Sequence, residues 1–263
     1  MIRIELRGLC KSFLKGNSII EAIKDVTLDV KVGEILVFVG PSGCGKSTIL
    51  NLITGTMEPS AGHVHYNGKL VTGVQTVARR VGYLTQKDTV LPWRTVLEDI
   101  MLPLEIQNIP HEERVERAMQ AVEMVRLKGF EHHYPKELSG GMRKRVLLAR
   151  TLVYQPETLL MDEPFGSLDA QTKLFMQNEL LQLWRKTKDV SIVFVTHDLG
   201  EAVALADRMV LFTGRPGTPK IVHEVDIPRP RDVFKIRFAK LYAETYNYLW
   251  NLLEEEVAKG EEL

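Results

Sequence analysis

The sequence predicts an α/β fold with a mostly parallel sheet flanked by helices, an antiparallel β part near the N-terminus and an inserted helical subdomain. Short continuous apolar runs lie at 35–40, 158–162 and 191–197, as is typical of parallel strands buried on both faces. Helical patterns separate these runs, which indicates βαβ units. The stretch 88–155 breaks this alternation, because it holds helical patterns and no strand pattern.

Each element rests on a local pattern. Three further segments, at 2–6, around 19–30 and at 63–66, alternate apolar and polar residues or are rich in β-branched residues. We expect them to form the antiparallel part. The predicted helices cover 46–54, 95–107, 111–126, 141–154, 170–187 and 199–206.

We divide the chain into residues 1–225, with the helical insertion at approximately 88–155, and residues 226–263. The second part begins with the proline-rich link DIPRPRD and continues into a last helix near 233–257. Its apolar residues recur mostly at three- and four-residue steps, so we expect one apolar face that packs on the core. These residues are Phe234, Phe238, Leu241, Leu249 and Leu252.

Composition excludes several classes of protein. Lys plus Arg equals Asp plus Glu at 34 each in 263 residues, which argues against nucleic acid as the main partner. Two cysteines, Cys10 and Cys44, do not make a disulfide scaffold, so we expect the chain to reside in a reducing cytosol. The N-terminus does not have the pattern of a signal peptide, and no apolar run approaches the roughly 20 residues of a membrane span. We therefore expect a soluble chain that reaches a membrane only through a partner.

The stretch GPSGCGKST at 40–48 fits the phosphate-loop pattern G-x-x-x-x-G-K-[ST]. It follows an apolar strand and opens a helix, which is the context that the motif requires. Lys46 can reach the β- and γ-phosphates of a nucleoside triphosphate, and Ser47 can ligate Mg²⁺. The alternative, a glycine-rich turn that binds nothing, does not explain the lysine and the Ser-Thr pair. The residues of the predicted cradle are Gly40, Pro41, Ser42, Gly43, Cys44, Gly45, Lys46, Ser47 and Thr48.

Two adjacent acids end the apolar run TLLMDEP at 158–164. Asp162, at the carboxyl end of the predicted strand, is expected beside the phosphate loop, where it would hold Mg²⁺ through water. Glu163 is placed to polarise an attacking water. Adjacent strand residues point in opposite directions, so the two acids have different roles. The alternative is a solvated acidic turn.

Two polar residues follow other predicted strands. His197 ends the run SIVFVTH, where it could contact the γ-phosphate or orient the water and Glu163. Gln86 ends GYLTQ, just before the helical insertion, and a neutral amide could sense Mg²⁺ or water there. Taken alone, a histidine at a strand end is more often structural than catalytic, and Gln86 is as well explained by an ordinary polar loop. The neighbouring motifs favour the functional interpretation of both.

A second cradle is predicted more than halfway along the chain. The segment LSGGM at 138–142 places a serine and two glycines before a helical pattern. Free backbone N–H groups and the helix dipole both favour an anion at such a helix start. The phosphate loop already supplies a phosphate site, so the role of a second anion site in the same chain needs an explanation.

In order, the chain carries GPSGCGKST, Gln86, LSGGM, LLMDEP, SLDA (167–170) and His197. This series resembles the ATP-binding-cassette (ABC) ATPases over about residues 2–225. The resemblance implies a phosphate-loop NTPase core of the ABC type, ATP and Mg²⁺ as cofactors, and ATP hydrolysis. The catalytic residues would be Lys46, Gln86, Glu163 and His197.

The resemblance also explains the second cradle. In this family the signature motif grips the γ-phosphate of ATP held by the other protomer, so two chains stack head to tail around two ATP molecules. Ser139, Gly140 and Gly141 would make that contact, and Asp169 in SLDA would link the two sites. Phe13 falls where the family stacks an aromatic ring on adenine; packing of Phe13 in the core is the open alternative.

Two residues depart from the family pattern. Met142 and Lys144 stand where glutamine is usual. Lys144 adds a positive charge near the start of a helix, which is unfavourable with the helix dipole, although it could help to hold an anion. The sequence gives no further account of Lys144.

The segments LPWRTVLEDI (91–100), PFGSLDAQT (164–172), RPGTPK and DIPRPRD are similar to those of ATPases for nitrate, sulfonate and taurine uptake. This implies a homodimeric import ATPase at the cytoplasmic face of the cell membrane. Its partners would be an integral membrane permease and, indirectly, a solute-binding protein, with no nucleic acid. A permease helix would lie beside Gln86, next to Leu91, Pro92 and Trp93, unless Trp93 belongs to the subdomain core. The competing hypothesis is a soluble ABC ATPase that acts on a nucleic-acid or ribosomal partner.

Overall fold

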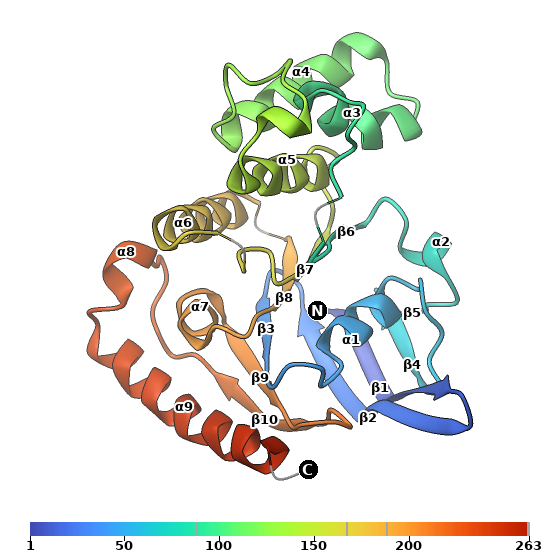
Figure 1. The fold of residues 1–263 in the computed structure, drawn as a ribbon, viewed down its shortest axis with the longest axis vertical. Coiled ribbons are helices and arrows are strands. Elements are labelled where there is room, and N and C mark those ends of the chain that lie inside the picture. Colours follow the sequence, from blue (N-terminus) through green and yellow to red (C-terminus); the bar gives the residue numbers. More distant parts are fainter. Residues whose placement is uncertain (88, 167, 188, 262–263) are drawn as a thin grey trace.

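Two sheets and the helices that cover them form the part of the chain that the structure describes (Figure 1). The computed structural model describes residues 1–261 apart from 88, 167 and 188. Residue 88, at the predicted start of the insertion, and residue 167, the first of SLDA, therefore lie outside the described residues.

The first sheet is antiparallel, with strand order β2-β1-β4-β5. Strands β1 (Ile2–Lys15) and β2 (Ser18–Lys31) form a long hairpin, and β4 (Ala61–Tyr66) pairs with the other edge of β1. The three predicted N-terminal strands are confirmed, although β1 continues well beyond residue 6. The short strand β5 (Lys69–Leu70) was not predicted.

The second sheet has strand order β10-β9-β3-β8-β7-β6 and is parallel from β9 to β6. Strand β10 is antiparallel to β9 at one edge. Strands β9 and β10, which complete this side of the sheet, were not predicted from the sequence. The strands are β3 (Ile35–Val39), β6 (Val81–Leu84), β7 (Thr158–Asp162), β8 (Ser191–Val195), β9 (Arg208–Phe212) and β10 (Pro219–Glu224).

Both faces of the central strands β3, β7 and β8 are buried, as the continuous apolar runs predict. On one face, Leu36 and Phe38 pack with the helix α1 (Lys46–Ile53) and the inner face of the antiparallel sheet. On the other face, Ile35 and Val37 join the main core. The main core includes residues of α6 (Ala170–Lys186) and α7 (Leu199–Leu205). The short helix α2 (Val74–Val77) contributes Val77 to the cluster that contains Leu36 and Phe38.

The helical subdomain lies at one end of the molecule (Figure 1). Among the described residues of 89–155 there is no strand, as predicted. The carboxylate of Asp99 is fully buried and accepts hydrogen bonds of 3.1 Å from Arg150, so this ion pair ties two helices together. Burial raises the pKa of Asp99, and the charge of Arg150 opposes that rise. The elements are α3 (Val96–Ile106), α4 (His111–Met124), the 3₁₀ turn η1 (Pro135–Glu137) and α5 (Gly140–Leu152).

The C-terminal segment corrects one prediction. Instead of one helix near 233–257, it forms α8 (Val233–Ile236) and α9 (Lys240–Glu261). Phe238 lies in the break and is 89% exposed, so the apolar face is not continuous. The sequence predicted one helix because the spacing of apolar residues does not reveal where a helix ends and another begins in a new direction. Packing on the main core is confirmed by Tyr242 and Leu249, which are buried there. The domain boundary at residue 225 stays a prediction.

Candidate functional site

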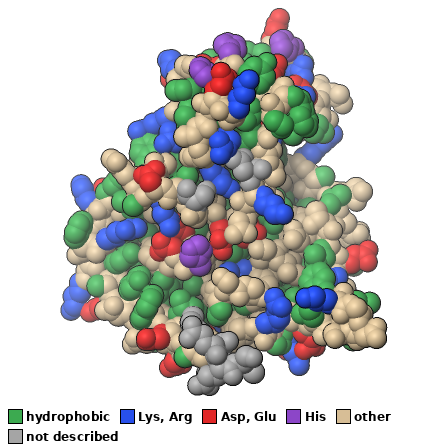
Figure 2. Space-filling view, in the orientation of Figure 1, with side chains coloured by type: hydrophobic (Ala, Val, Ile, Leu, Met, Phe, Trp, Pro, Cys, Tyr) green, Lys and Arg blue, Asp and Glu red, His purple; other side chains and the backbone are tan. Residues whose placement is uncertain are grey.

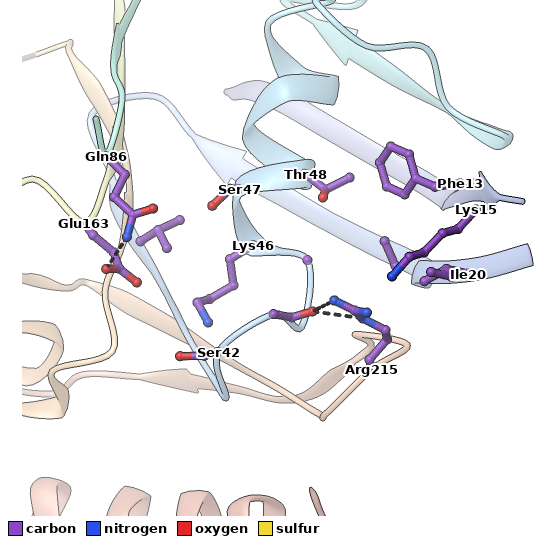
Figure 3. A pocket seen from close by; sticks show the side chains of 14 residues that line it. Phe13, Lys15, Ile20, Ser42, Lys46, Ser47, Thr48, Gln86, Glu163 and Arg215 are labelled. Atoms are coloured by element: carbon purple, nitrogen blue, oxygen red, sulfur yellow. Dashed lines mark hydrogen bonds between the residues drawn. The ribbon is translucent and has the colours of Figure 1, made fainter. Parts of the chain in front are cut away.

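Three predicted site residues meet at one edge of the parallel sheet. Strands β6, β7 and β8 are neighbours, so their carboxyl ends lie together, and Gln86, Glu163 and His197 each follow one of them. Gln86 Nε2 donates a hydrogen bond of 3.0 Å to Glu163 Oε2 (Figure 3), and His197 Nδ1 lies 3.4 Å from the same oxygen. One carboxylate oxygen therefore connects the ends of three strands.

Glu163 has a left-handed backbone, with φ of 46°. For a residue other than glycine this conformation costs on the order of 1 kcal/mol. Two hydrogen bonds hold it, because its N–H donates to Val195 O at 3.0 Å and its carbonyl accepts from Gly166 N–H at 3.2 Å. Asp162 ends β7 and Glu163 lies beyond it, so the strand alternation that we expected to separate the two acids does not extend to Glu163. The left-handed turn sets its direction instead.

The phosphate loop connects β3 to α1, and the first residue of α1 is the buried Lys46. Lys46 Nζ donates to the carbonyl oxygens of Gly40 and Pro41, at 2.8 and 2.9 Å. Gly45, the N-cap of α1, has φ of 98°, and a Cβ there would lie 2.4 Å from Ile23 Cγ2. Glycine is thus required at this position. No side chain caps the start of α1, so the helix N-terminus and Lys46 together suit an anion.

A cavity of about 510 Å³ opens beside this loop, a size typical of ligand sites. Figure 3 shows Gln86 and Glu163 on one side of Lys46 and Phe13 on the other. Phe13 is 38% exposed and lines the cavity, so its alternative placement in the core is wrong. Its stacking on adenine stays a prediction. The described lining residues are Phe13, Lys15, Ile20, Ala22, Ser42, Gly43, Gly45, Lys46, Ser47, Thr48, Gln86, Glu163, Val195 and Arg215.

Some predicted residues support the loop without lining that cavity. Cys44 is buried, with its Sγ 3.5 Å from Lys46 Nζ, and it fills space beneath the loop. Gly40 and Pro41 offer Lys46 their carbonyl oxygens. These three residues therefore shape the cradle from behind.

Asp162 is a buried carboxylate next to Ser47. Burial raises the pKa of Asp162; a hydrogen bond from Ser47 lowers it, the charge of Glu163 raises it, and the charge of Lys46 lowers it. A hydroxyl and a carboxylate are hard oxygen ligands of the kind that Mg²⁺ prefers, and the ion would favour the charged carboxylate. Ser47 and Asp162 thus fit a magnesium site. The side chain of Gln86, the third predicted metal residue, contacts Glu163 in this structure.

The turn that carries His197 is held by ion pairs. Asp198 caps α7 by accepting hydrogen bonds from the N–H groups of Gly200 and Glu201, at 2.8 and 3.2 Å. Lys173 Nζ lies 2.8 Å from Asp198 Oδ2. Burial favours the neutral form of Asp198, but the hydrogen bond and charge of Lys173 leave its pKa below the ordinary value. This anchored cap fixes the backbone next to His197.

The second cradle does not join the first within this chain. Ser139 is the N-cap of α5, and its Oγ accepts a hydrogen bond of 3.2 Å from Met142 N–H. Ser139 and Gly140 are exposed, and none of residues 138–142 is among the described residues that line the cavity. The helix start is thus formed and accessible, at the base of the helical subdomain (Figure 1).

Asp169 is likewise away from the cavity lining that the structure describes. It is the N-cap of α6 and accepts a hydrogen bond of 3.0 Å from Thr172 N–H. This hydrogen bond lowers the pKa of Asp169. The structure therefore shows a capping role, while the predicted link between two sites of a dimer stays a prediction.

Sequence reasoning missed Arg215 as a residue of the cavity. Its Nε and Nη2 donate to Gly43 O at 3.3 and 3.1 Å, as the dashed lines in Figure 3 show. Two residues later, Gly217 packs so tightly that a Cβ would lie 1.9 Å from Cys44 O. The turn after β9 thus presses on the phosphate loop. The only signal in the sequence was the segment RPGTPK, which by itself indicates a turn.

Arg215 places a cation beside the phosphate loop, so Arg215→Met is expected to raise the Kd for ATP about threefold, with kcat little changed. The effect should shrink at high salt, since Arg215 is exposed and its charge is screened. Titration with a fluorescent ATP analogue at two salt concentrations measures this. Arg7→Met is the matched control, because Arg7 pairs with Glu5 on the antiparallel sheet and does not line the cavity. An unchanged Kd for Arg215→Met would contradict the prediction.

Comparisons with known proteins now define the class. A family model described as ABC transporter matches residues 23–166, more than half of the chain. The fold is that of an ATP-binding cassette. The chain belongs to the ABC transporter family as an ATP-binding subunit, and it is an ATPase.

Relatives cover nearly the whole chain. An uncharacterized ABC transporter ATP-binding protein of Methanocaldococcus jannaschii is 44% identical over 98% of this chain and 94% of its own length. The aliphatic sulfonates import ATP-binding protein SsuB of Bacillus licheniformis is 41% identical over 84% of each chain. The nitrate import ATP-binding protein NrtD of a Synechocystis strain is 37% identical over 92% of this chain and 90% of its own.

A solved structure supports the fold. It is the dimeric structure of a post-hydrolysis state of an ATP-binding cassette bound to ADP and Pi. It matches with a TM-score of 0.78 and 31% sequence identity, over 86% of this chain and 100% of the other. The resemblance to ABC ATPases and the predicted α/β cassette fold are thereby confirmed.

Proposed function

We propose that this chain is the ATP-hydrolysing subunit of an importer, and that two copies join head to tail around two ATP molecules. The observation that carries this proposal is the split site. The phosphate loop, Glu163 and Gln86 line one cavity, whereas the formed helix start at Ser139 is exposed elsewhere. A second chain in the opposite orientation would bring each Ser139 to the other's cavity. The dimeric state of the solved relative supports this arrangement.

The residues of the cavity have distinct tasks in this proposal. Lys46 and the N-terminus of α1 neutralise the β- and γ-phosphates of ATP. Ser47 and Asp162 hold Mg²⁺, which when bound offsets the phosphate charge. Phe13 stacks on adenine. A hydrogen bond already joins Ser47 to Asp162, so this pair needs little reorganisation to receive the ion.

Glu163 acts as the general base. Its Oε2 accepts a proton from a water molecule as the water oxygen bonds to the γ-phosphorus, and the bond from phosphorus to the β–γ bridging oxygen breaks to leave ADP and phosphate. Gln86 and His197 both contact that same oxygen of Glu163 and orient it. The left-handed backbone of Glu163 is consistent with a functional constraint at this position.

The coupling surface is proposed next to Gln86. A cytoplasmic helix of the permease would lie along the segment that leads into α3, and residue 88 of that segment is outside the described residues. Trp93 is 70% exposed and Pro92 is exposed, so the alternative that Trp93 belongs to the subdomain core is wrong. An exposed tryptophan is a typical anchor for a partner. Closure and opening of the dimer would then move the two helical subdomains and the permease together.

The relatives support a proposal for the solute and the location. Two of them are named for import of aliphatic sulfonates and of nitrate, so we propose uptake of nitrate, sulfonate or taurine-like solutes at the cytoplasmic face of the membrane. In the part of the chain that the structure describes, no helix is long and apolar enough to cross a bilayer. Attachment would be peripheral, through the permease, with a solute-binding protein as an indirect partner.

A partner pull-down tests the proposal. The tagged Glu163→Gln chain is expressed in its native host, membranes are solubilised gently with ATP present, and co-purifying proteins are identified. An integral permease is the expected partner. Ribosomal or DNA-repair partners without a permease would overturn the import function while leaving the ATPase chemistry intact. Figure 2 shows Lys and Arg interspersed with Asp and Glu on the visible face, which does not favour nucleic acid.

A further inference from the structure

Lys144 is a buried cation in the signature helix. It lies in the second turn of α5, five residues after Ser139, and only 6% of it is exposed. Lysine is almost never buried to this extent without a partner, because desolvation disfavours its charged form. Something must therefore stabilise the ammonium group at this position.

Lys144 has a hydrogen-bond partner at the edge of the parallel sheet where Gln86, Glu163 and His197 meet. Lys144 Nζ donates a hydrogen bond of 2.8 Å to the backbone carbonyl of Gln86. The two residues come from different parts of the fold, since Gln86 follows β6 and Lys144 belongs to the helical subdomain. A hydrogen bond from a charged donor is shorter and stronger than a neutral one, so this contact is a firm link between them.

The link continues to the carboxylate that contacts water in the proposed reaction. Gln86 Nε2 donates to Glu163 Oε2 at 3.0 Å, and His197 Nδ1 lies 3.4 Å from that oxygen. Lys144 thus fixes the backbone of Gln86, and the side chain of Gln86 contacts Glu163. An error of about 1 Å in the placement of a catalytic group can cost on the order of 100-fold in rate.

We propose that Lys144 is a positioning residue, which ties the signature helix to Gln86 and through it sets the orientation of Glu163. This inference rests on the proposed roles of Gln86 and Glu163. It explains the departure at residue 144, where glutamine is usual in the family: a glutamine amide can donate to the same carbonyl, whereas lysine adds a charge to the bond. Because Ser139 and Lys144 share one helix, a shift of the helix start on nucleotide contact is passed to Gln86.

The first test compares two substitutions at this position. Lys144→Met keeps the length and apolar stem but removes the donor, and it is expected to lower kcat for ATP hydrolysis about 10-fold, or about 1.4 kcal/mol. The KM for ATP should change little, because Lys144 is not among the described residues that line the cavity. Lys144→Gln retains a donor and should recover kcat to within about twofold of the unmodified chain.

The matched control is Lys128→Met in the same subdomain. Lys128 is largely exposed, and its ion pair with Glu123 spans 3.8 Å, so its loss should leave kcat and Tm unchanged. If Lys144→Met and Lys144→Gln lower kcat equally, the hydrogen bond to Gln86 is not what matters and the inference is overturned. The same holds if Lys144→Met leaves kcat unchanged.

The second test separates positioning from a general effect on folding. In a Gln86→Ala background there is no side chain left to orient, so Lys144→Met should lower kcat by less than about twofold there. An equal 10-fold loss in both backgrounds would show a structural role and overturn the inference. If Gln86→Ala itself leaves kcat unchanged, the proposed role of Gln86 fails and the inference fails with it. If Gln86→Ala lowers kcat but Lys144→Met does not, only the inference fails.

Discussion

Glu163→Gln is expected to lower kcat for ATP hydrolysis by about 100-fold or more while ATP still binds. Glutamine has nearly the shape of glutamate but cannot accept the proton of the attacking water. Its amide can keep the contact with Gln86 only after reorientation, since Gln86 Nε2 donates to Glu163 Oε2 in the structure. Lys46, Ser47 and the rest of the phosphate loop are unchanged, so the Kd for ATP should stay within about threefold.

The same substitution should produce a stable dimer. With hydrolysis blocked, ATP persists between the phosphate loop of one chain and the exposed helix start at Ser139 of the other, and the closed state accumulates. Light scattering with and without Mg²⁺-ATP measures the mass. We expect a monomer without nucleotide and a dimer with it.

Adding Ser139→Arg to Glu163→Gln provides the internal control. The arginine removes the cap of α5 and places a bulky side chain at the proposed contact, so the dimer should be lost. ATP binding to the phosphate loop should remain, because no residue of 138–142 is among the described lining of the cavity. If the double variant dimerises as well as Glu163→Gln alone, the proposed role of the signature segment is wrong.

Asp162→Asn is expected to lower kcat/KM for Mg²⁺-ATP by about 100-fold and yet to raise the Tm of the protein without nucleotide. The raised pKa of Asp162 means that, without a cation, the folded state holds its proton more firmly than the unfolded state. For such a group the free energy of unfolding falls as pH rises from the ordinary carboxyl range through the folded pKa. At neutral pH the ionised Asp162 is therefore destabilising, and the neutral asparagine removes that cost.

Differential scanning calorimetry across pH checks both signs. Asp162→Asn should have a Tm about 2 °C or more above that of the unmodified chain at pH 7. The difference should shrink as pH falls and vanish below about pH 3, where Asp162 is protonated in both the folded and the unfolded chain. Mg²⁺-ATP should raise the Tm of the unmodified chain more than that of the variant, since it binds the folded state through Asp162. A lower Tm for Asp162→Asn at pH 7 would contradict this account.

Much of the fold follows from local patterns in the sequence. The continuous apolar runs at 35–39, 158–162 and 191–195 are strands buried on both faces, and the helical stretch between β6 and β7 is the inserted subdomain. Because parallel strands end at one edge, the residues that follow them could be expected to meet. In the structure, Gln86 and His197 both contact Glu163.

The remaining features depend on contacts that no local pattern encodes. Arg215 reaches the phosphate loop from a turn late in the chain, and only the fold brings it to Gly43. The left-handed backbone of Glu163 is held in part by the hydrogen bond from its N–H to the carbonyl oxygen of Val195 in β8. Lys144 seemed unfavourable in its own helix, because the carbonyl of Gln86 that accepts its hydrogen bond belongs to a different subdomain.

The position of β3 in the sheet has a consequence for biosynthesis. This strand leads into the phosphate loop, yet its two neighbours, β8 and β9, begin only at Ser191 and Arg208. A growing chain must therefore wait for distant partners before the strand can be paired, and such non-local pairing is slow. On a ribosome, the phosphate-loop motif is synthesised early, whereas the cavity is completed only after Arg215 has emerged. We expect nascent chains shorter than this to be unable to capture ATP, so that this subunit competes for nucleotide only when its full catalytic edge is in place.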